Sequence, residues 1–219
     1  MARTTDHARH EDVAWRAFEA IRARGVHGVS MSDVAADLGM KRSSLYWYFS
    51  GLDAIFEAVL ERTLERLGAS VAERLAERLA DSDGEAEHPV RLVAAWMEAV
   101  IAFYDDDPQL IGVLAQFWAL GSAHDAEKVL ARTRTFLEPI LAGAVDMLEQ
   151  GVAAGQVEPC DAPALVDLCV ATVDGLLVHQ VSRGVAPRPA LQVFVDAVLL
   201  PLERKPTTAP TARWSAEED

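Results

Sequence analysis

Apolar residues recur at three- and four-residue steps along almost the whole chain, and this spacing constrains the fold more than any other feature of the sequence. Between residues 53 and 80 the apolar series is long and regular: Leu60, Leu64, Leu67, Val71, Leu75 and Leu79. Residues at these steps share one face of an α-helix. The segment GLLVHQV at 175–181 reads as a strand in isolation, but its flanks continue at helical spacing. We therefore expect an all-α fold.

Turn and capping residues set the expected helix boundaries. Gly25 and Gly28 end the first helix, and Gly39 stops the second. Ser30 and Asp33 form a capping box at the start of that second helix, with Asp in place of the usual Glu. The expected helices span residues 8–24, 30–38, 41–49, 53–80, 90–104, 109–120, 125–150, 162–183 and 189–202. The Pro/Thr/Ala-rich tail becomes acidic, and we expect it to be disordered.

Charge separates the first fifty residues from the rest of the chain. The formal net charge is −14, yet residues 1–50 hold seven Lys and Arg against six Asp and Glu. An acidic body argues against a nonspecific polyanion binder and leaves the N-terminal part as the region able to approach nucleic acid. The polar N-terminus lacks the apolar core of a secretory signal, and no run of 18 apolar residues occurs. We therefore expect a cytoplasmic protein without a membrane-spanning helix.

The third expected helix carries basic, hydroxyl and aromatic side chains together, in KRSSLYWYFSG at 41–51. At 100° per residue, Leu45 and Phe49 fall on one side, where they can pack on the preceding helices, and Tyr48 lies at the edge. The opposite side presents Arg42, Ser43, Tyr46 and Trp47. Such an outward face suits a DNA major groove, because Arg reaches guanine, hydroxyls reach phosphate and aromatic rims contact thymine methyl groups. The alternative is that the three aromatic side chains pack against the next helix.

The stretch VSMSDVAADLGMKRSSLYWYF at 29–49 resembles the TetR (tetracycline-repressor) family of bacterial transcription regulators. The resemblance lies in the spacing of Ser30, Val34-Ala35, Gly39 and the Leu45-to-Phe49 run, followed at once by a long helix. It covers about the first sixty residues, and the helical remainder of the chain is consistent with it.

The resemblance implies a homodimer whose first three helices bind an operator, expected to be palindromic, in double-stranded DNA. It implies a helix-turn-helix DNA-binding domain at 1–52, a helical ligand-binding and dimerisation domain at 53–203, and a tail at 204–219. The positions implied to contact DNA are Ser30, Lys41, Arg42, Ser43, Ser44, Tyr46, Trp47 and Tyr48. One position departs from the family pattern, because Leu52 stands where a Lys usually contacts a phosphate.

Large apolar side chains in the central helices suggest a pocket for a small apolar or aromatic effector. The candidate ligand-binding residues are Trp96, Val100, Phe103, Phe117, Trp118, Phe136 and His179. The aromatic residues among them suit an apolar ligand, and His179 is one polar group able to orient it. The alternative is that the aromatic side chains simply form the core.

Other chemistry is not indicated by the sequence. No Gly-rich phosphate loop, Ser/His/Asp arrangement or nucleophile elbow is present, so we expect neither an enzyme nor a cofactor. Two cysteines are too few for a four-ligand zinc site, and His7 with His10 on a terminal helix is a weak metal candidate, so we expect no metal site.

The sequence thus predicts a ligand-responsive transcriptional regulator, and we expect a repressor that its effector releases from DNA. One rival hypothesis is an apolar-ligand carrier with weak or vestigial DNA binding. Another is a helical protein that uses the dimerisation surface to bind a different partner.

Overall fold

The computed structural model describes residues 2–24, 29–81, 88–107, 110–112 and 126–204. Its helices are α1 (Ala2–Arg24), α2 (Met31–Asp37), α3 (Arg42–Tyr48), α4 (Leu52–Asp81), α5 (Pro89–Asp106), α7 (Ala126–Ala153), α8 (Ala162–Arg183) and α9 (Pro187–Phe194). α9 continues through a π-helical stretch, η1 (Val195–Leu199), and a 3-10 turn, η2 (Leu200–Leu202). The described residues contain no strand beyond one isolated bridge between Val157 and Glu203, so the all-α prediction is confirmed.

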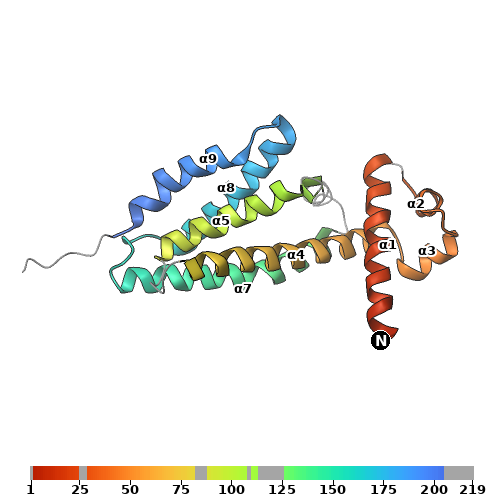
Figure 1. Cartoon of the computed structure of the whole chain (residues 1–219), viewed down its shortest axis with the longest axis horizontal. Helices are drawn as coiled ribbons and strands as arrows, with labels where there is room; N and C mark the ends of the chain where they lie inside the picture. The colour runs from red at the N-terminus through yellow and green to blue at the C-terminus, as the bar shows by residue number, and fades with distance from the viewer. Residues whose placement is uncertain (1, 25–28, 82–87, 108–109, 113–125, 205–219) are drawn as a thin grey trace, which may run out of the picture.

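The small N-terminal domain is built around the apolar faces of α1, α2 and α3. Phe18, Ile21, Val34 and Leu45 are completely or almost completely buried between these helices and the start of α4. The ring of Phe18 meets the ring of Phe56 edge to face at 6.0 Å. In Figure 1, α1 crosses the start of α4, with α2 and α3 on its far side. This packing leaves the other face of α3 exposed.

Two local features define the start of α2 and its connection to α3. The backbone N–H of Asp33 donates to Ser30 Oγ at 3.3 Å, and the backbone N–H of Ser30 donates to Asp33 Oδ2 at 2.9 Å. This reciprocal pair is the predicted capping box. Gly39 then turns the chain with φ +64°, a conformation that glycine adopts at little cost. α3 therefore begins after a turn of fixed geometry.

The C-terminal half is a helical bundle into which α4 extends from the N-terminal domain (Figure 1). α5 is its central helix and is buried on most sides, as its continuous apolar sequence predicts. α4, α7, α8 and α9 pack against α5. Ion pairs close the end of the bundle farthest from α3: Arg91 contacts Glu203 at 2.7 Å, and Arg204 contacts Glu158 at 2.9 Å.

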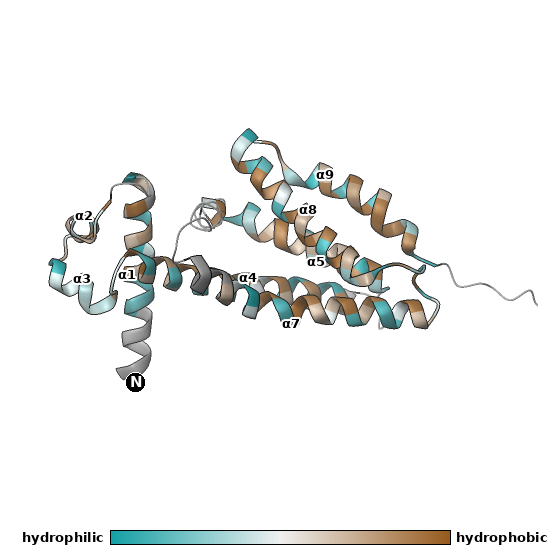
Figure 2. Cartoon of the chain, turned by 180° about the vertical axis from the view of Figure 1, so that it is seen from behind, coloured by the Kyte–Doolittle hydropathy of each residue, from teal (hydrophilic) through white to brown (hydrophobic). Residues whose placement is uncertain are grey.

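α8 is long and apolar. It is the one helix among the described residues whose length and composition alone would allow it to span a membrane, a property that the core helix of a bundle can share. It packs on α5, α7 and α9 through Val166, Cys169, Val173 and Leu177. Much of α8 is nevertheless exposed, and apolar residues colour long stretches of α8 and α9 in Figure 2.

Several sequence predictions fall partly or wholly outside the described residues. These are the short helix at 109–120 and the tail at 204–219. Phe117 and Trp118, two of the candidate ligand-binding residues, also lie outside the described residues.

Candidate DNA interface and ligand cavity

α3 presents the predicted polar and aromatic face to solvent. Leu45 and Phe49 are buried, whereas Trp47 is 71% exposed and Tyr46 is 42% exposed. Lys41, Arg42, Ser43 and Ser44 are exposed as well. The orientation that the helical wheel predicts for this helix is therefore confirmed.

Arg42 and Tyr46 form a pair on this surface. Their spacing of four residues places them one helical turn apart. Arg42 Nη2 donates to the Tyr46 hydroxyl oxygen at 3.3 Å, and Arg42 Cζ lies 5.2 Å from the centre of the tyrosine ring. This contact restricts the guanidinium group while leaving most of its N–H donors accessible.

Tyr48 is half-buried, unlike its two aromatic neighbours. Its ring lies 4.8 Å from Trp47, edge to face, and 6.1 Å from His10 of α1. His10 also contacts the buried ring of Phe49, at 4.6 Å. Tyr48 therefore anchors the end of α3 to α1, which agrees with its predicted position at the edge of the outward face.

Two residues that bear on phosphate binding have neighbours within the protein. Leu52 is half-buried and packs on the hydrophobic core, so this position supplies no cation. Arg24, at the end of α1, forms an ion pair with Asp37 of α2. The pairing raises the pKa of Arg24 and lowers the pKa of Asp37, in each case mainly through the hydrogen bond between the two side chains.

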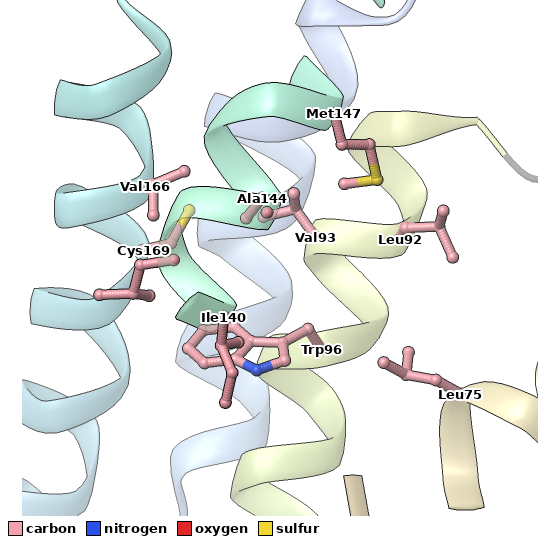
Figure 3. A pocket seen from close by; sticks show the side chains of 11 residues that line it. Leu75, Leu92, Val93, Trp96, Ile140, Ala144, Met147, Val166 and Cys169 are labelled. Carbon is pink, nitrogen blue, oxygen red and sulfur yellow. The ribbon is translucent and has the colours of Figure 1, made fainter. Parts of the chain in front are cut away.

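A second candidate site is a partly open cavity of about 230 Å³ lined by four helices of the C-terminal half. Its walls come from α4, α5, α7 and α8: Leu75, Leu92, Val93, Trp96, Ile140, Leu141, Gly143, Ala144, Met147, Val166 and Cys169. None of these side chains is charged. In Figure 3, Trp96 and Ile140 lie at one end of the cavity and Met147 at the other.

One of the candidate ligand-binding residues, Trp96, lines this cavity. Val100 and Phe103 follow it on α5 but are buried in the core, where the Phe103 ring meets Tyr104 edge to face. Phe136 lies against α4 outside the cavity walls. His179 is exposed on α8. Among the members of this set that the structure describes, only Trp96 lines the cavity.

Sequence reasoning missed most of the cavity wall because it followed large aromatic residues. Much of the wall is made by α7, where Ile140, Gly143, Ala144 and Met147 recur at helical spacing. The small residues Gly143 and Ala144 leave room that a larger side chain would fill. A small-residue interruption in an apolar stripe is a weak signal, since the same pattern occurs at tight helix contacts.

Cys169 supplies the sulfur atom seen beside Ala144 in Figure 3. The residue is 1% exposed, and burial raises the pKa of its thiol to about 11. An apolar environment disfavours the thiolate because it cannot solvate the charge. The thiol is therefore neutral near pH 7 and acts as part of an uncharged wall.

Comparison with known proteins supports the assignment of the N-terminal domain. Residues 16–59 match the bacterial regulatory proteins of the tetR family. This match spans α2, α3, the end of α1 and the start of α4. No curated protein matches the chain at a significant level.

Solved structures share the fold of the whole chain. A TetR-family transcriptional regulator, PfmR from Thermus thermophilus, is 18% identical with a TM-score of 0.65, covering 89% of this chain and 97% of its own. A TetR transcription regulator from Haloarcula marismortui is 17% identical with a TM-score of 0.67, covering 88% and 98%. The transcriptional regulator FadR from Bacillus subtilis, in complex with stearoyl-CoA, is 16% identical with a TM-score of 0.64, covering 86% and 96%.

The family match reaches only the first quarter of the chain, and the structural similarity extends along nearly all of it. The exposed face of α3 lies within the matched residues, and the cavity lies within the shared fold. Residues 16–59 therefore match the tetR family of bacterial regulatory proteins, and nearly the whole chain has the fold of solved TetR-family transcriptional regulators.

Proposed function

We propose that the protein is a cytoplasmic, dimeric repressor that binds an operator through α3 and is released by a small apolar effector. The observation that carries the proposal is the outward face of α3, where Arg42, Ser43, Tyr46 and Trp47 are all exposed. A solvated face with a cation, hydroxyls and aromatic rims offers the groups that read the major groove.

The neighbouring residues are assigned supporting roles. Ser30 and Lys41 begin α2 and α3, so we assign them to the phosphate backbone, together with Ser44. Arg42 is assigned to a base, because its bidentate donor pattern suits guanine. Tyr48 is assigned mainly to positioning α3, since its ring lies against His10 and Trp47.

Dimerisation is proposed through α8 and α9. Large apolar side chains stay exposed on these helices and in the turn between them: Leu168, Val178, Val181, Val185 and Val193. Exposure of several such groups on adjacent helices marks a contact surface. Gly175 lies on the same outward side of α8 as Leu168 and Val178, and a Cβ there would meet no atom within 4 Å. A second copy can therefore approach the α8 backbone closely.

A symmetric dimer presents two copies of α3. When their separation matches one helical repeat of DNA, about 34 Å, both enter successive major grooves and the operator is palindromic. We propose that effector binding shifts the population toward a separation that no longer matches. By linkage, the effector must bind the DNA-bound protein more weakly, by the same factor by which it weakens DNA binding.

The cavity defines the effector class. None of its described lining residues is charged, so an ionised group buried against them would lose its hydration without gaining a partner. A cavity of about 150 Å³ holds benzene, so a cavity of about 230 Å³ suits an uncharged molecule of one or two rings, or an aliphatic chain of similar bulk. The FadR complex with stearoyl-CoA supports ligand binding within this fold, while the ligand proposed here is smaller.

A second candidate function is an apolar-ligand carrier with weak DNA binding. It is favoured by the half-buried Leu52 and by the pairing of Arg24 with Asp37, which together reduce the cations able to reach a phosphate. The two functions differ in whether the ligand alters DNA binding.

The test begins with the full-length protein and a pool of random duplexes, from which bound sequences are selected and their affinity is measured by fluorescence anisotropy. A thermal-shift screen of uncharged one- and two-ring compounds then identifies ligands, and each hit is added to the operator complex. We expect enrichment of a palindrome and at least one hit that releases it. Hits that raise the melting temperature but leave operator affinity unchanged would favour the carrier.

A further inference from the structure

We propose that Phe136 of α7 couples the cavity to the DNA-binding domain by pressing directly on α4 at Gly68. The inference rests on the proposed function, because it identifies the contact through which an occupied cavity changes DNA binding. It also gives Phe136 a role different from the ligand contact expected from the sequence.

The contact is a ring packed on bare backbone. A Cβ atom built at Gly68 would lie 3.2 Å from Phe136 Cζ and 3.4 Å from Cε2, closer than most carbon contacts in proteins. Glycine in the middle of a helix costs about 1 kcal/mol relative to alanine. Its presence within the 30-residue α4 lets the ring reach the helix itself rather than a flexible side chain.

Phe136 lies on the same stripe of α7 as the cavity wall. Ile140 follows it by four residues, and Ala144 and Met147 continue at steps of four and three. Residues at these steps lie above one another along one helix face. A ligand that displaces the cavity-lining turns of α7 therefore also displaces the ring, which is one turn away.

Gly68 lies between the cavity and the DNA-binding domain along α4. Leu75 of α4 lines the cavity, and Gly68 precedes it by seven residues, about 10 Å nearer to α3 at 1.5 Å per residue. Figure 1 shows α7 running alongside α4 over this part of the bundle. Pressure from Phe136 thus acts on the portion of α4 that leads to the N-terminal domain.

The decisive experiment separates coupling from simple packing. Gly143→Phe adds a ring at the open side of the cavity, because Gly143 lines the cavity, is exposed and would place a Cβ with no atom within 4 Å. Operator affinity is measured for the wild type, Gly143→Phe, Phe136→Ala and the double variant. We expect Gly143→Phe to weaken operator binding about tenfold when Phe136 is present and less than twofold when it is absent.

Gly68→Ala provides a second test that does not depend on deleting the ring. The added methyl group must displace Phe136 by a few tenths of an ångström, so we expect operator affinity to change without any ligand. In the Phe136→Leu background the smaller side chain relieves the crowding, and we expect the Gly68→Ala effect to vanish. Denaturant unfolding of every variant provides the stability readout.

The outcomes are distinguishable from failure of the proposed function. If the wild type selects no operator, the proposed function fails and the inference fails with it. If the wild type binds an operator but Gly143→Phe leaves the affinity unchanged, effector control through the cavity fails. If Gly143→Phe weakens binding equally with and without Phe136, the ring is only a packing residue, and this inference alone is overturned.

Discussion

Trp47 of α3 and Trp96 of α5 show how differently the two ends of the molecule use the same side chain. Trp47 is 71% exposed on a helix face that also carries Arg42 and Ser43. Trp96 is half-buried in a cavity whose described lining residues are all uncharged. An open, hydrated face suits a polyanion, whose binding is driven largely by counterion release. An apolar cavity wall instead selects by shape and by the absence of charge.

The comparison also explains why an acidic protein can contain a DNA-binding surface. The charges nearly balance within the first fifty residues, so the net charge of −14 arises from the rest of the chain. Long-range repulsion from the acidic body opposes nonspecific association with DNA, so we propose that specific binding relies on the few exposed groups of α3. We expect such a protein to discriminate between operator and random DNA more strongly, and to bind random DNA more weakly.

The largest expected effect comes from a substitution on α8, outside both the α3 face and the cavity. Gly175→Arg places a long charged side chain on the exposed face of α8, where a Cβ meets nothing within 4 Å. We expect the subunit to fold normally, because Arg favours helix more than Gly, and the dimer and operator binding to be lost. Sedimentation and circular dichroism measure the two properties separately. A dimer that survives this substitution would place the subunit contact elsewhere.

A second prediction tests whether the cavity wall excludes water from the thiol of Cys169. In a Cys160→Ser background Cys169 is the sole thiol, since the chain has two cysteines. Its pKa, raised from 9.0 to about 11, lowers the thiolate fraction near pH 8 about 100-fold. We expect alkylation by iodoacetamide to be slow and to accelerate tenfold per pH unit until about pH 11. A rate plateau near pH 9 would show that the thiol is hydrated.

The open face is tested by Arg42→Ala. We expect a loss of about 1–3 kcal/mol in operator affinity, together with relaxed preference at one base pair, because the guanidinium is assigned to a base edge. Arg42→Lys is the matched control, since it keeps the charge but lacks the planar bidentate donor pattern. Equal weakening on operator and random duplexes would instead assign Arg42 to a phosphate.

The smallest expected effect is at Leu52. Leu52→Lys adds a cation at the start of α4, and we expect slightly tighter binding to every duplex with a salt slope steeper by about one unit. Anisotropy titrations at several salt concentrations measure the slope. Leu52→Met controls for the loss of packing, because it adds no charge. An unchanged slope would show that this end of α4 does not approach the DNA backbone.

The orientation of α3 could be predicted from the sequence because it depends on local rules. The 3.6-residue period separates Leu45 from Trp47, and the Ser30–Asp33 capping box and Gly39 are short-range features. The same rules placed α5 in the core. Local periodicity therefore accounts for most of the helix boundaries and for the exposed face.

The cavity could not be predicted in the same way, because four separate helices build it. Periodicity cannot distinguish Trp96, which lines the cavity, from Phe103, which lies in the core about two turns later on the same helix. It also gave no reason to separate His179, on the exposed side of α8, from the buried Leu177. Those distinctions depend on how α7 and α8 pack, which is a property of the tertiary structure.

The continuity of α4 has a mechanical consequence. This one helix of 30 residues begins beside α3 and carries Leu75 in the cavity wall, and at 1.5 Å per residue it is about 45 Å long. A rigid rod of that length amplifies angle into distance, so a tilt of about 5° at one end moves the other end by about 4 Å. In a dimer the two rods would tilt in opposite directions, and the displacement between their tips would double. A displacement of α4 at the cavity smaller than the width of one aromatic ring would then be enough to move the two copies of α3 away from the spacing of successive major grooves.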